Sequence, residues 1–243
     1  MRALSASDII STWERGIGLH PVDQALVLLS AACPSLAPEQ LASLAIGRRD
    51  ASLLRLRESI FGPTATSTAT CPQCSEALEF TVRTTDWVAD PAPDRGAPYE
   101  LAQDGLALKF RLLDSTDLRT LAACPNVVAA RRLLQDRCVL EVSRDGVRIA
   151  CESLSEQETA HLASHMAECD PLADVALDLE CAICNHGWSV AFDIASFLWH
   201  EIDALAKRLL GEVHTLARFY GWSETDILAL SPARRNYYLE RAS

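Results

Sequence analysis

Apolar residues recur at helical spacing in the N-terminal part of the chain. Over residues 1–61 they fall every three or four positions, which is the period of one buried helix face. Pro21 and Pro38 suit the first turn of a helix, because proline lacks the N–H that the first turn leaves unpaired. Gly62-Pro63 ends the last of these segments. The pattern predicts four consecutive helices, the fourth of which spans about Asp50–Ile60.

The C-terminal part of the chain has a helical pattern as well. Apolar residues from Leu198 to Tyr220 step by three or four and predict one long helix with a single apolar stripe. Gly221 follows, and glycine readily adopts the left-handed conformation that ends a helix. Two short helices are expected after it, because Ser223 and Ser231 are suitable caps. This region therefore predicts a long helix followed by a helical hairpin.

Between these helical regions, apolar and polar residues alternate and predict strands. Thr64–Thr70 is rich in β-prone threonine, and Leu78–Arg83 has the period of two that a half-buried strand requires. Residues 175–193 return to the same strand character. Asp90–Pro98 is rich in proline, glycine and aspartate and predicts a linker.

The segment from residue 99 to about 170 predicts a mixture of helices and strands. Strands are expected over Leu106–Leu113 and on both sides of the turn Arg144-Asp145-Gly146. A helix capped at residue 114 is expected to break at Pro125 and to resume as far as residue 137. The capping box Ser155–Glu158 opens another helix that reaches about residue 168.

Composition narrows the possible partners of the chain. The 243 residues carry a formal net charge of −11, and 49% of them are hydrophobic, as in an ordinary globular protein. Nucleic acids and anionic membrane surfaces both attract clustered cations, so this acidic balance argues against either as a partner. The chain contains no apolar run of about 18 residues and no signal-peptide core, so we expect a cytoplasmic protein.

Nine cysteines are many for a chain in a reducing compartment, where disulfides are rare. Four of them form two C-x-x-C pairs, Cys71/Cys74 and Cys181/Cys184, and each pair precedes a strand-like segment. Two such hairpins can bring four thiolates into a tetrahedron around Zn²⁺, although residues 75–180 separate them. Four thiolates leave no open position, so we expect a structural ion. Two unrelated cysteine pairs, or a redox pair, remain as alternatives, but a redox pair normally opens a helix.

With a zinc site at the cysteine pairs, the predicted elements describe an α+β protein. We expect a helical N-terminal region over residues 1–62 and a C-terminal helical region over residues 194–243. A split zinc-ribbon-like β module occupies residues 63–89 and 175–193, and it encloses an α/β insert over residues 90–174. All four parts are expected to pack together.

A second candidate cluster consists of His161, His165 and Cys169, which share one helix face at i, i+4 and i+8. Two histidines at this spacing can share a metal ion, but Leu162 occupies the position of the glutamate in the H-E-x-x-H motif. A polar helix face is the simpler interpretation. The chain has neither a nucleophile–base signature nor a glycine-rich phosphate loop, so we expect no enzymatic activity and no small-molecule substrate. An enzyme that uses this helix face remains an alternative.

The C-terminal residues carry a resemblance to a known protein family. A long helix runs into the turn Tyr220-Gly221-Trp222, followed by Ile227–Leu230 and by a last segment that contains Arg234-Arg235 and Tyr237-Tyr238. Together with the stretch Leu44–Arg57 and the two separated C-x-x-C pairs, this pattern resembles the baseplate hub assembly proteins of contractile, T-even-type phage tails and related injection systems. Residues 90–175 lie outside the resemblance.

The resemblance implies a non-enzymatic protein that binds baseplate or hub proteins and assists their assembly. Such a protein need not stay in the finished particle. A permanent structural subunit of the baseplate is the alternative, and an enzyme or a nucleic-acid-binding zinc ribbon is less favoured.

The aromatic and arginine residues near the C-terminus are the candidates for binding a partner protein, because such side chains are enriched in protein interfaces. These candidates are Tyr220, Trp222, Arg234, Arg235 and Tyr237. Packing of the aromatic rings onto the long helix is the competing interpretation for most of them. Tyr237 and Tyr238 are adjacent on a helix and point in different directions, so at least one of them is expected to be exposed.

Overall fold

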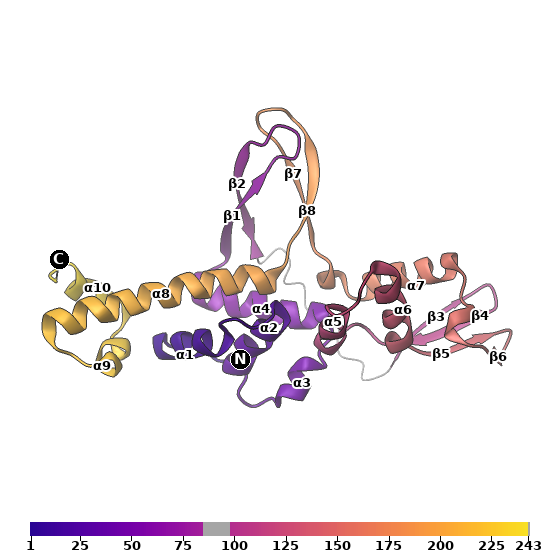
Figure 1. Cartoon of the computed structure of the whole chain (residues 1–243), viewed down its shortest axis with the longest axis horizontal. Helices are drawn as coiled ribbons and strands as arrows, with labels where there is room; N and C mark the ends of the chain where they lie inside the picture. Colours follow the sequence, from indigo (N-terminus) through magenta and orange to yellow (C-terminus); the bar gives the residue numbers. More distant parts are fainter. Residues whose placement is uncertain (85–97, 243) are drawn as a thin grey trace.

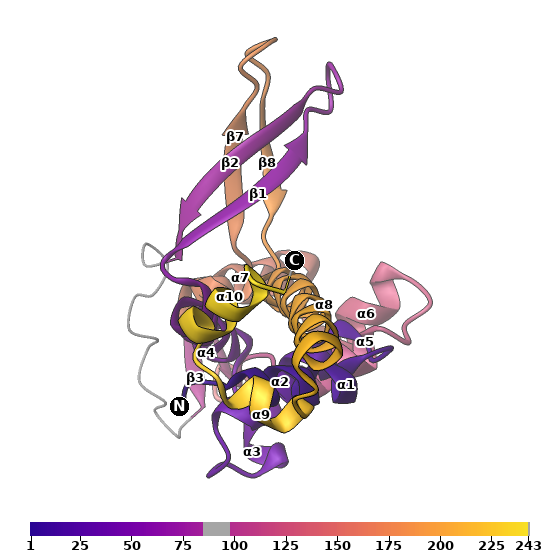
Figure 2. The same ribbon diagram turned by 90° about the vertical axis from the view of Figure 1, so that its left-hand side faces the viewer.

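A computed structural model describes residues 1–84 and 98–242 of the chain. The helical body lies at the centre of the molecule (Figure 1). It consists of α1 (Ala6–Gly16), α2 (Pro21–Ala32), α3 (Pro38–Ala42), α4 (Ile46–Phe61) and the first part of α8 (Ile194–Tyr220). The N-terminal helices and α8 are far apart in the sequence, yet they lie side by side in this body (Figure 2).

One apolar core unites the helices of this body. Aliphatic side chains from α1, α2 and α4 pack against the buried stripe of α8, where Leu198, Ile202 and Leu209 are buried. Gly16 lets α1 approach α8 closely, because a Cβ atom at this position would overlap the ring of Trp199. Arg57 of α4, which is 3% exposed, donates to both carboxylate oxygens of Glu201 on α8 at 2.8 and 3.0 Å. The N-terminal helices and the first part of α8 therefore form one packing unit.

Two β-hairpins rise from the same side of the helical body and form what we call the hairpin arm (Figure 1). The first hairpin pairs β1 (Thr64–Thr70) with β2 (Ala77–Arg83), and the second pairs β7 (Ala176–Glu180) with β8 (Gly187–Ala191). Each hairpin is a separate antiparallel sheet of two strands. The strand-like segments around both cysteine pairs are thus confirmed as strands.

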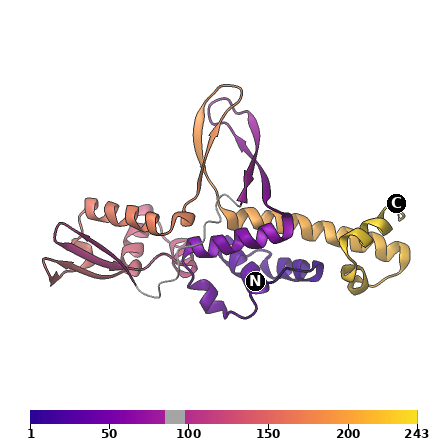
Figure 3. The same cartoon turned by 180° about the vertical axis from the view of Figure 1, so that it is seen from behind.

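The insert between the hairpins lies at one end of the long axis of the molecule (Figure 3). Its antiparallel sheet has the order β3 (Tyr99–Gln103), β4 (Leu106–Phe110), β5 (Val139–Arg144) and β6 (Val147–Arg148). The helices of the insert are α5 (Ser115–Leu121), α6 (Val127–Cys138) and α7 (Glu156–Cys169), with short 3₁₀ turns at Cys151–Ser153 and Pro171–Ala173. Leu162 of α7 packs on Leu106, Leu108, Phe110 and Val142 of the sheet, and these residues form a second, smaller core.

The C-terminal tip occupies the opposite end of the long axis (Figures 1 and 3). It comprises the last turns of α8, together with α9 (Glu224–Ala229) and α10 (Pro232–Leu239). Gly221 ends α8 with a left-handed φ of 70°, and Ser223 and Ser231 cap the two short helices as expected. Val213, Leu216 and Ile227 form the buried centre of the tip.

The α+β class is confirmed, and the differences from the sequence predictions are local. The fourth helix begins at Ile46 rather than near Asp50, because its first turn is bonded by groups of the insert: Leu113 accepts from the Ile46 N–H and Asp170 accepts from the Gly47 N–H. Sequence periodicity contains no information about such distant partners.

Two further differences concern the insert. The strand β3 was not predicted, because its five residues carry too short an alternation to be recognised without its partner β4. The strand expected over Leu106–Leu113 ends already at Phe110. The linker predicted at Asp90–Pro98 lies, except for Pro98, outside the described residues.

Candidate metal centre

The turn that carries the first cysteine pair is a tight loop at the end of the β1–β2 hairpin. The Cys71 N–H donates to the Glu76 carbonyl at 2.8 Å, and the Ser75 N–H donates back to the Cys71 carbonyl at 2.9 Å. Ser75 has a φ of 62°, so the chain reverses through a left-handed residue directly after Cys74. This reversal aims both cysteines of the pair to the same side of the loop.

The second cysteine pair has the same backbone arrangement. The Cys181 N–H donates to the His186 carbonyl at 3.0 Å, and the Asn185 N–H donates to the Cys181 carbonyl at 2.8 Å. Asn185 has a φ of 54°, and asparagine tolerates the left-handed region better than most residues. The two pairs are therefore equivalent loops at the ends of two hairpins.

The four sulfur atoms meet where the two hairpin ends come together. All four Sγ atoms lie within 4.8 Å of one another, with 3.7 Å between Cys71 and Cys184 and 3.6 Å between Cys74 and Cys181. A disulfide requires a sulfur–sulfur distance of about 2 Å, so these are not disulfide partners. In a tetrahedron with Zn–S bonds of about 2.3 Å, neighbouring sulfurs lie about 3.8 Å apart. The distances thus fit a four-thiolate metal site.

Backbone groups of the loops favour the thiolate form that a metal ion requires. N–H groups of Cys184 and Ile183 donate to the sulfur of Cys181 and lower the pKa of this thiol to about 7. Backbone hydrogen bonds also favour the thiolates of Cys74 and Cys184, but desolvation and the neighbouring sulfurs outweigh them and raise the pKa of both thiols. Cys71 and Cys181 are buried, whereas Cys74 is exposed to solvent. Two ligands are therefore shielded, and an ion can still enter from the side of Cys74.

The hairpin arm has little other support at its end. Its covered positions alternate with exposed ones along each strand. Ala65 is buried, and the partly buried positions are Ser67, Ala69, Leu78, Phe80, Val82, Leu177, Leu179, Trp188 and Val190. Among the described residues, the three buried apolar clusters include none of these side chains. A two-stranded hairpin is marginally stable by itself, so a metal ion that joins both loops would be the main constraint on the arm.

The second candidate cluster does not converge on a common point. His165 contacts Glu168 through Nδ1 at 3.2 Å, and its Nε2 lies 4.0 Å from the sulfur of Cys169. The ring of His165 also packs edge-on against Phe110 of the sheet. Within residues 1–84 and 98–242, the four cysteines of the arm are the one group of three or more suitably placed ligands. The histidine face is thus not a metal site in this structure.

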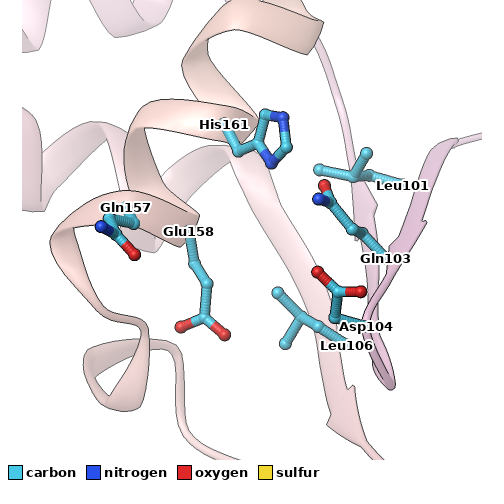
Figure 4. Close-up of a pocket in the computed structure, with 7 residues that line it drawn as sticks. All are labelled: Leu101, Gln103, Asp104, Leu106, Gln157, Glu158 and His161. Atoms are coloured by element: carbon cyan, nitrogen blue, oxygen red, sulfur yellow. The ribbon is translucent and has the colours of Figure 1, made fainter.

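His161 lines a small pocket between α7 and the β3–β4 turn (Figure 4). The pocket has a volume of about 150 Å³, and Asp104 and Glu158 are among the side chains around it. Ligand pockets usually measure about 300–1,000 Å³, so this hollow is small for a substrate site. Glu158 is also engaged by Arg144 at 2.8 Å.

The candidate partner-binding residues at the C-terminus separate into internal and external ones. Tyr220 and Trp222 stack on each other with ring centroids 4.6 Å apart, and both are partly buried against the core of the tip. Arg235 is 5% exposed and donates to Glu212 of α8 at 2.7 Å, so it fastens α10 to α8 instead of facing a partner. Arg234 is exposed, and Tyr237 is 52% exposed.

Sequence reasoning missed a group of buried charges where the helical body meets the insert. Arg49 and Asp50 follow each other in α4, both are buried, and Arg49 donates to the Asp50 carboxylate at 2.7 Å. Asp170 of the insert caps α4 through the Gly47 N–H at 3.0 Å. The only sequence signal was the absence of a capping side chain at Ala45, directly before α4.

A family model described as T4 bacteriophage base plate protein matches residues 22–199, which is well over half of the chain. The chain belongs to this family. The match covers both cysteine pairs and the entire insert, so membership extends through the segment that the sequence motifs left unassigned. The C-terminal tip of this baseplate protein lies beyond the matched residues. Membership gives the chain a role in a phage-type baseplate.

Comparison with curated proteins and with solved structures yields no further match. Among the described residues of this baseplate protein, no helix combines the length and the apolar content needed to cross a bilayer.

Proposed function

We propose that this baseplate protein is a non-enzymatic assembly factor, which binds other baseplate or hub proteins while a contractile tail or injection machine is built. The observation that carries the proposal is the family match over residues 22–199. A protein-binding role is supported by the exposed arginine and aromatic side chains of the C-terminal tip. The expected cytoplasmic location agrees with this role, because tails are assembled inside the host cell.

We also propose that the ion held by Cys71, Cys74, Cys181 and Cys184 is zinc and that its role is structural. Tetrahedral sites of four thiolates suit zinc, and iron is the main competitor for such a site. Four protein ligands fill the coordination sphere, so no position is left for a substrate or for an activated water. Elemental analysis of the purified protein should find one zinc per chain. One iron per chain would overturn the assignment of the metal.

The experiment that tests the assembly role compares two samples from cells that build the particle. In the first, the tagged chain is captured and the bound proteins are identified by mass spectrometry. In the second, the protein content of purified mature particles is measured. Captured baseplate proteins together with absence from mature particles would support an assembly factor. Presence in both samples would instead make the chain a permanent structural subunit, and capture without any baseplate protein would contradict both roles.

A further inference from the structure

Five aromatic rings form a continuous cluster at the C-terminal tip. Tyr220 contacts Phe219, Trp222 and Tyr238, and Tyr238 in turn contacts Trp222 and Tyr237, with ring centroids between 4.6 and 5.7 Å apart. The inner rings are partly buried, but Phe219 is 59% exposed and Tyr237 is 52% exposed. Large exposed rings that are anchored by packing behind them are typical of protein-binding surfaces.

The helix α10 divides its side chains between two faces. Arg235 and Tyr238 turn towards α8 and the core of the tip. Arg234 and Tyr237 lie at i and i+3 on α10, Arg241 lies in the turn directly after the helix, and all three are exposed. The guanidinium of Arg241 lies 3.5 Å from the ring centroid of Tyr237, so these two side chains are in contact at the surface. We call these three residues the α10 stripe.

The positive charges of the α10 stripe have no acidic partner within the described residues. Arg241 donates to the Tyr237 carbonyl at 3.0 Å, and neither Arg234 nor Arg241 forms an ion pair in residues 1–84 and 98–242. Arg235, directly next to the stripe, is by contrast paired with Glu212. The chain as a whole has a net charge of −11, and these two arginines lie beside an exposed aromatic ring.

We propose that the α10 stripe docks an acidic surface of another baseplate protein, and this inference rests on the proposed function. Tyr237 would fill an apolar recess of that surface, and Arg234 and Arg241 would bind carboxylates on either side of it. Arginine pairs with carboxylates through two parallel hydrogen bonds, which gives such a contact a defined orientation.

A protein is favoured over a nucleic acid as the occupant. The phosphates of a nucleic acid would have to approach a chain with a net charge of −11, and this repulsion opposes the broad electrostatic contact that nucleic-acid binding requires. A compact acidic patch on a folded partner can contact the two arginines alone. It therefore avoids the repulsion that a long polyanion would experience along the rest of this acidic surface. An apolar recess for the Tyr237 ring is likewise a feature of proteins.

The test places a photo-reactive benzoylphenylalanine at position 237 of the full-length chain. Cells that assemble the particle are irradiated, and the cross-linked segment is identified by mass spectrometry. We expect a segment of a baseplate protein that contains at least two Asp or Glu residues. The variant R234E/R241E should lower the cross-linking yield at least tenfold. Lysines in place of the mapped acidic residues of the partner should restore the yield in this variant.

The matched control reverses two arginines elsewhere on the surface. R131E/R132E changes two exposed residues of α6 by the same charge and should leave the cross-linking yield within twofold. Melting curves confirm that both variants fold. If R234E/R241E melts at a lower temperature, the milder R234Q/R241Q should still lower the yield several-fold. Cross-links to nucleic acid, to a second copy of this chain or to a segment without carboxylates would overturn the inference. An unchanged yield in the charge-reversal variant would do the same.

Deletion of the gene separates this inference from the proposed function on which it rests. Normal tail production without the chain would overturn the proposed function itself. Tail production that requires the chain, but proceeds normally with R234E/R241E, would overturn only the docking role of the α10 stripe.

Discussion

The helical body and the hairpin arm of this baseplate protein are held together by different forces. The body packs α1, α2, α4 and the first part of α8 around buried aliphatic side chains. The arm contributes no strand residue to any buried apolar cluster among the described residues, and its two hairpins meet through four sulfur atoms. Apolar burial thus stabilises one region, whereas metal coordination is the constraint available to the other.

Because of this difference, the two regions should lose their structure under different conditions. A chelator or an oxidant acts on thiolates and should loosen the arm first. Heat or a cavity in the core acts on the body and should leave metal binding intact until the body unfolds. Substitutions in each region test whether the arm and the body unfold separately.

Replacing Cys181 by serine should abolish metal binding and disorder the arm. Structural zinc sites of small domains contribute about 10–16 kcal/mol of binding energy, which a chain without the full ligand set cannot recover. Elemental analysis should find less than a tenth of an equivalent of metal. Limited proteolysis should cut within residues 64–83 and 176–191, while the helical circular dichroism signal is largely retained.

The control for this experiment is Cys124→Ser, because Cys124 lies outside the metal centre and its thiol donates to the Thr120 carbonyl at 3.8 Å. This variant should keep its metal and its resistance to protease. Loss of the helical signal together with the metal in Cys181→Ser would show that the arm and the body unfold as one unit, and the comparison would then be wrong.

Replacing Leu198 by alanine should destabilise the body without loss of metal. Leu198 is fully buried where α8 crosses the N-terminal helices, and large-to-small changes at such sites cost about 2–5 kcal/mol. Denaturant unfolding should detect this loss, and elemental analysis should find an unchanged metal content. Leu36→Ala removes the same atoms from an exposed position and should change the free energy of unfolding by less than about 0.5 kcal/mol.

The buried pair of Arg49 and Asp50, where the helical body meets the insert, should make the free energy of unfolding depend on pH. Burial raises the pKa of Asp50 to about 6, because the attraction of Arg49 only partly offsets the lost hydration. The folded chain therefore binds this proton more tightly than the unfolded chain. The resulting stability is complete below about pH 4 and is lost as the pH rises through about 6, by about 3 kcal/mol.

The variant Asp50→Asn has no titratable group at this position. Its free energy of unfolding should therefore lack the decrease between pH 4 and pH 6 that Asp50 causes in the original chain. The measurement is the difference in the free energy of unfolding between the variant and the original chain at each pH. Both chains carry the same cysteines, so any effect of thiol protonation cancels in the difference. Parallel curves would show that Asp50 does not titrate in this range.

Asp117 of the insert should give the opposite pH dependence, in which the free energy of unfolding decreases as the pH falls. Its side chain is fully buried, yet hydrogen bonds from Arg111 and Arg137 overcome the effect of burial and lower its pKa to about 2. The stability that this carboxylate provides is present above about pH 4 and is lost as the pH falls towards 2. Solvent around the partly exposed arginines limits the effect to roughly 1–2 kcal/mol.

Asp117→Asn should therefore lose less stability than the original chain between pH 4 and pH 2. Asp136→Asn, an exposed change on the neighbouring helix α6, should follow the original chain at each pH. Equal losses in all three chains would show that the ion pairs of Asp117 do not stabilise the insert. Denaturant unfolding at a series of pH values provides the measurement.

Local sequence patterns predicted most elements, because their causes are local. The caps Ser155, Ser223 and Ser231 bond to N–H groups three residues further on. The C-x-x-C spacing likewise defined the ligand set, since paired cysteines in hairpins have few other uses in a reducing environment. The structure brings all four together across more than a hundred residues.

The errors arose where a distant residue decides the outcome. The first turn of α4 depends on Asp170, the strand β3 depends on β4, and the burial of Arg235 depends on Glu212. Adjacent arginines are indistinguishable in sequence, yet Arg234 faces solvent and Arg235 faces α8 because the packing of α10 chooses the inner side.

Residues close together in the chain thus specify most of the helices, the two hairpins of the arm, the class of the fold and the chemistry of the metal ligands. The packing of distant segments determines that the N-terminal helices share one core with the first part of α8, that the histidine face does not gather around a metal, and which arginine of the C-terminal pair is exposed. These outcomes depend on which surfaces meet when the apolar faces are buried, and that choice is made by the whole chain at once.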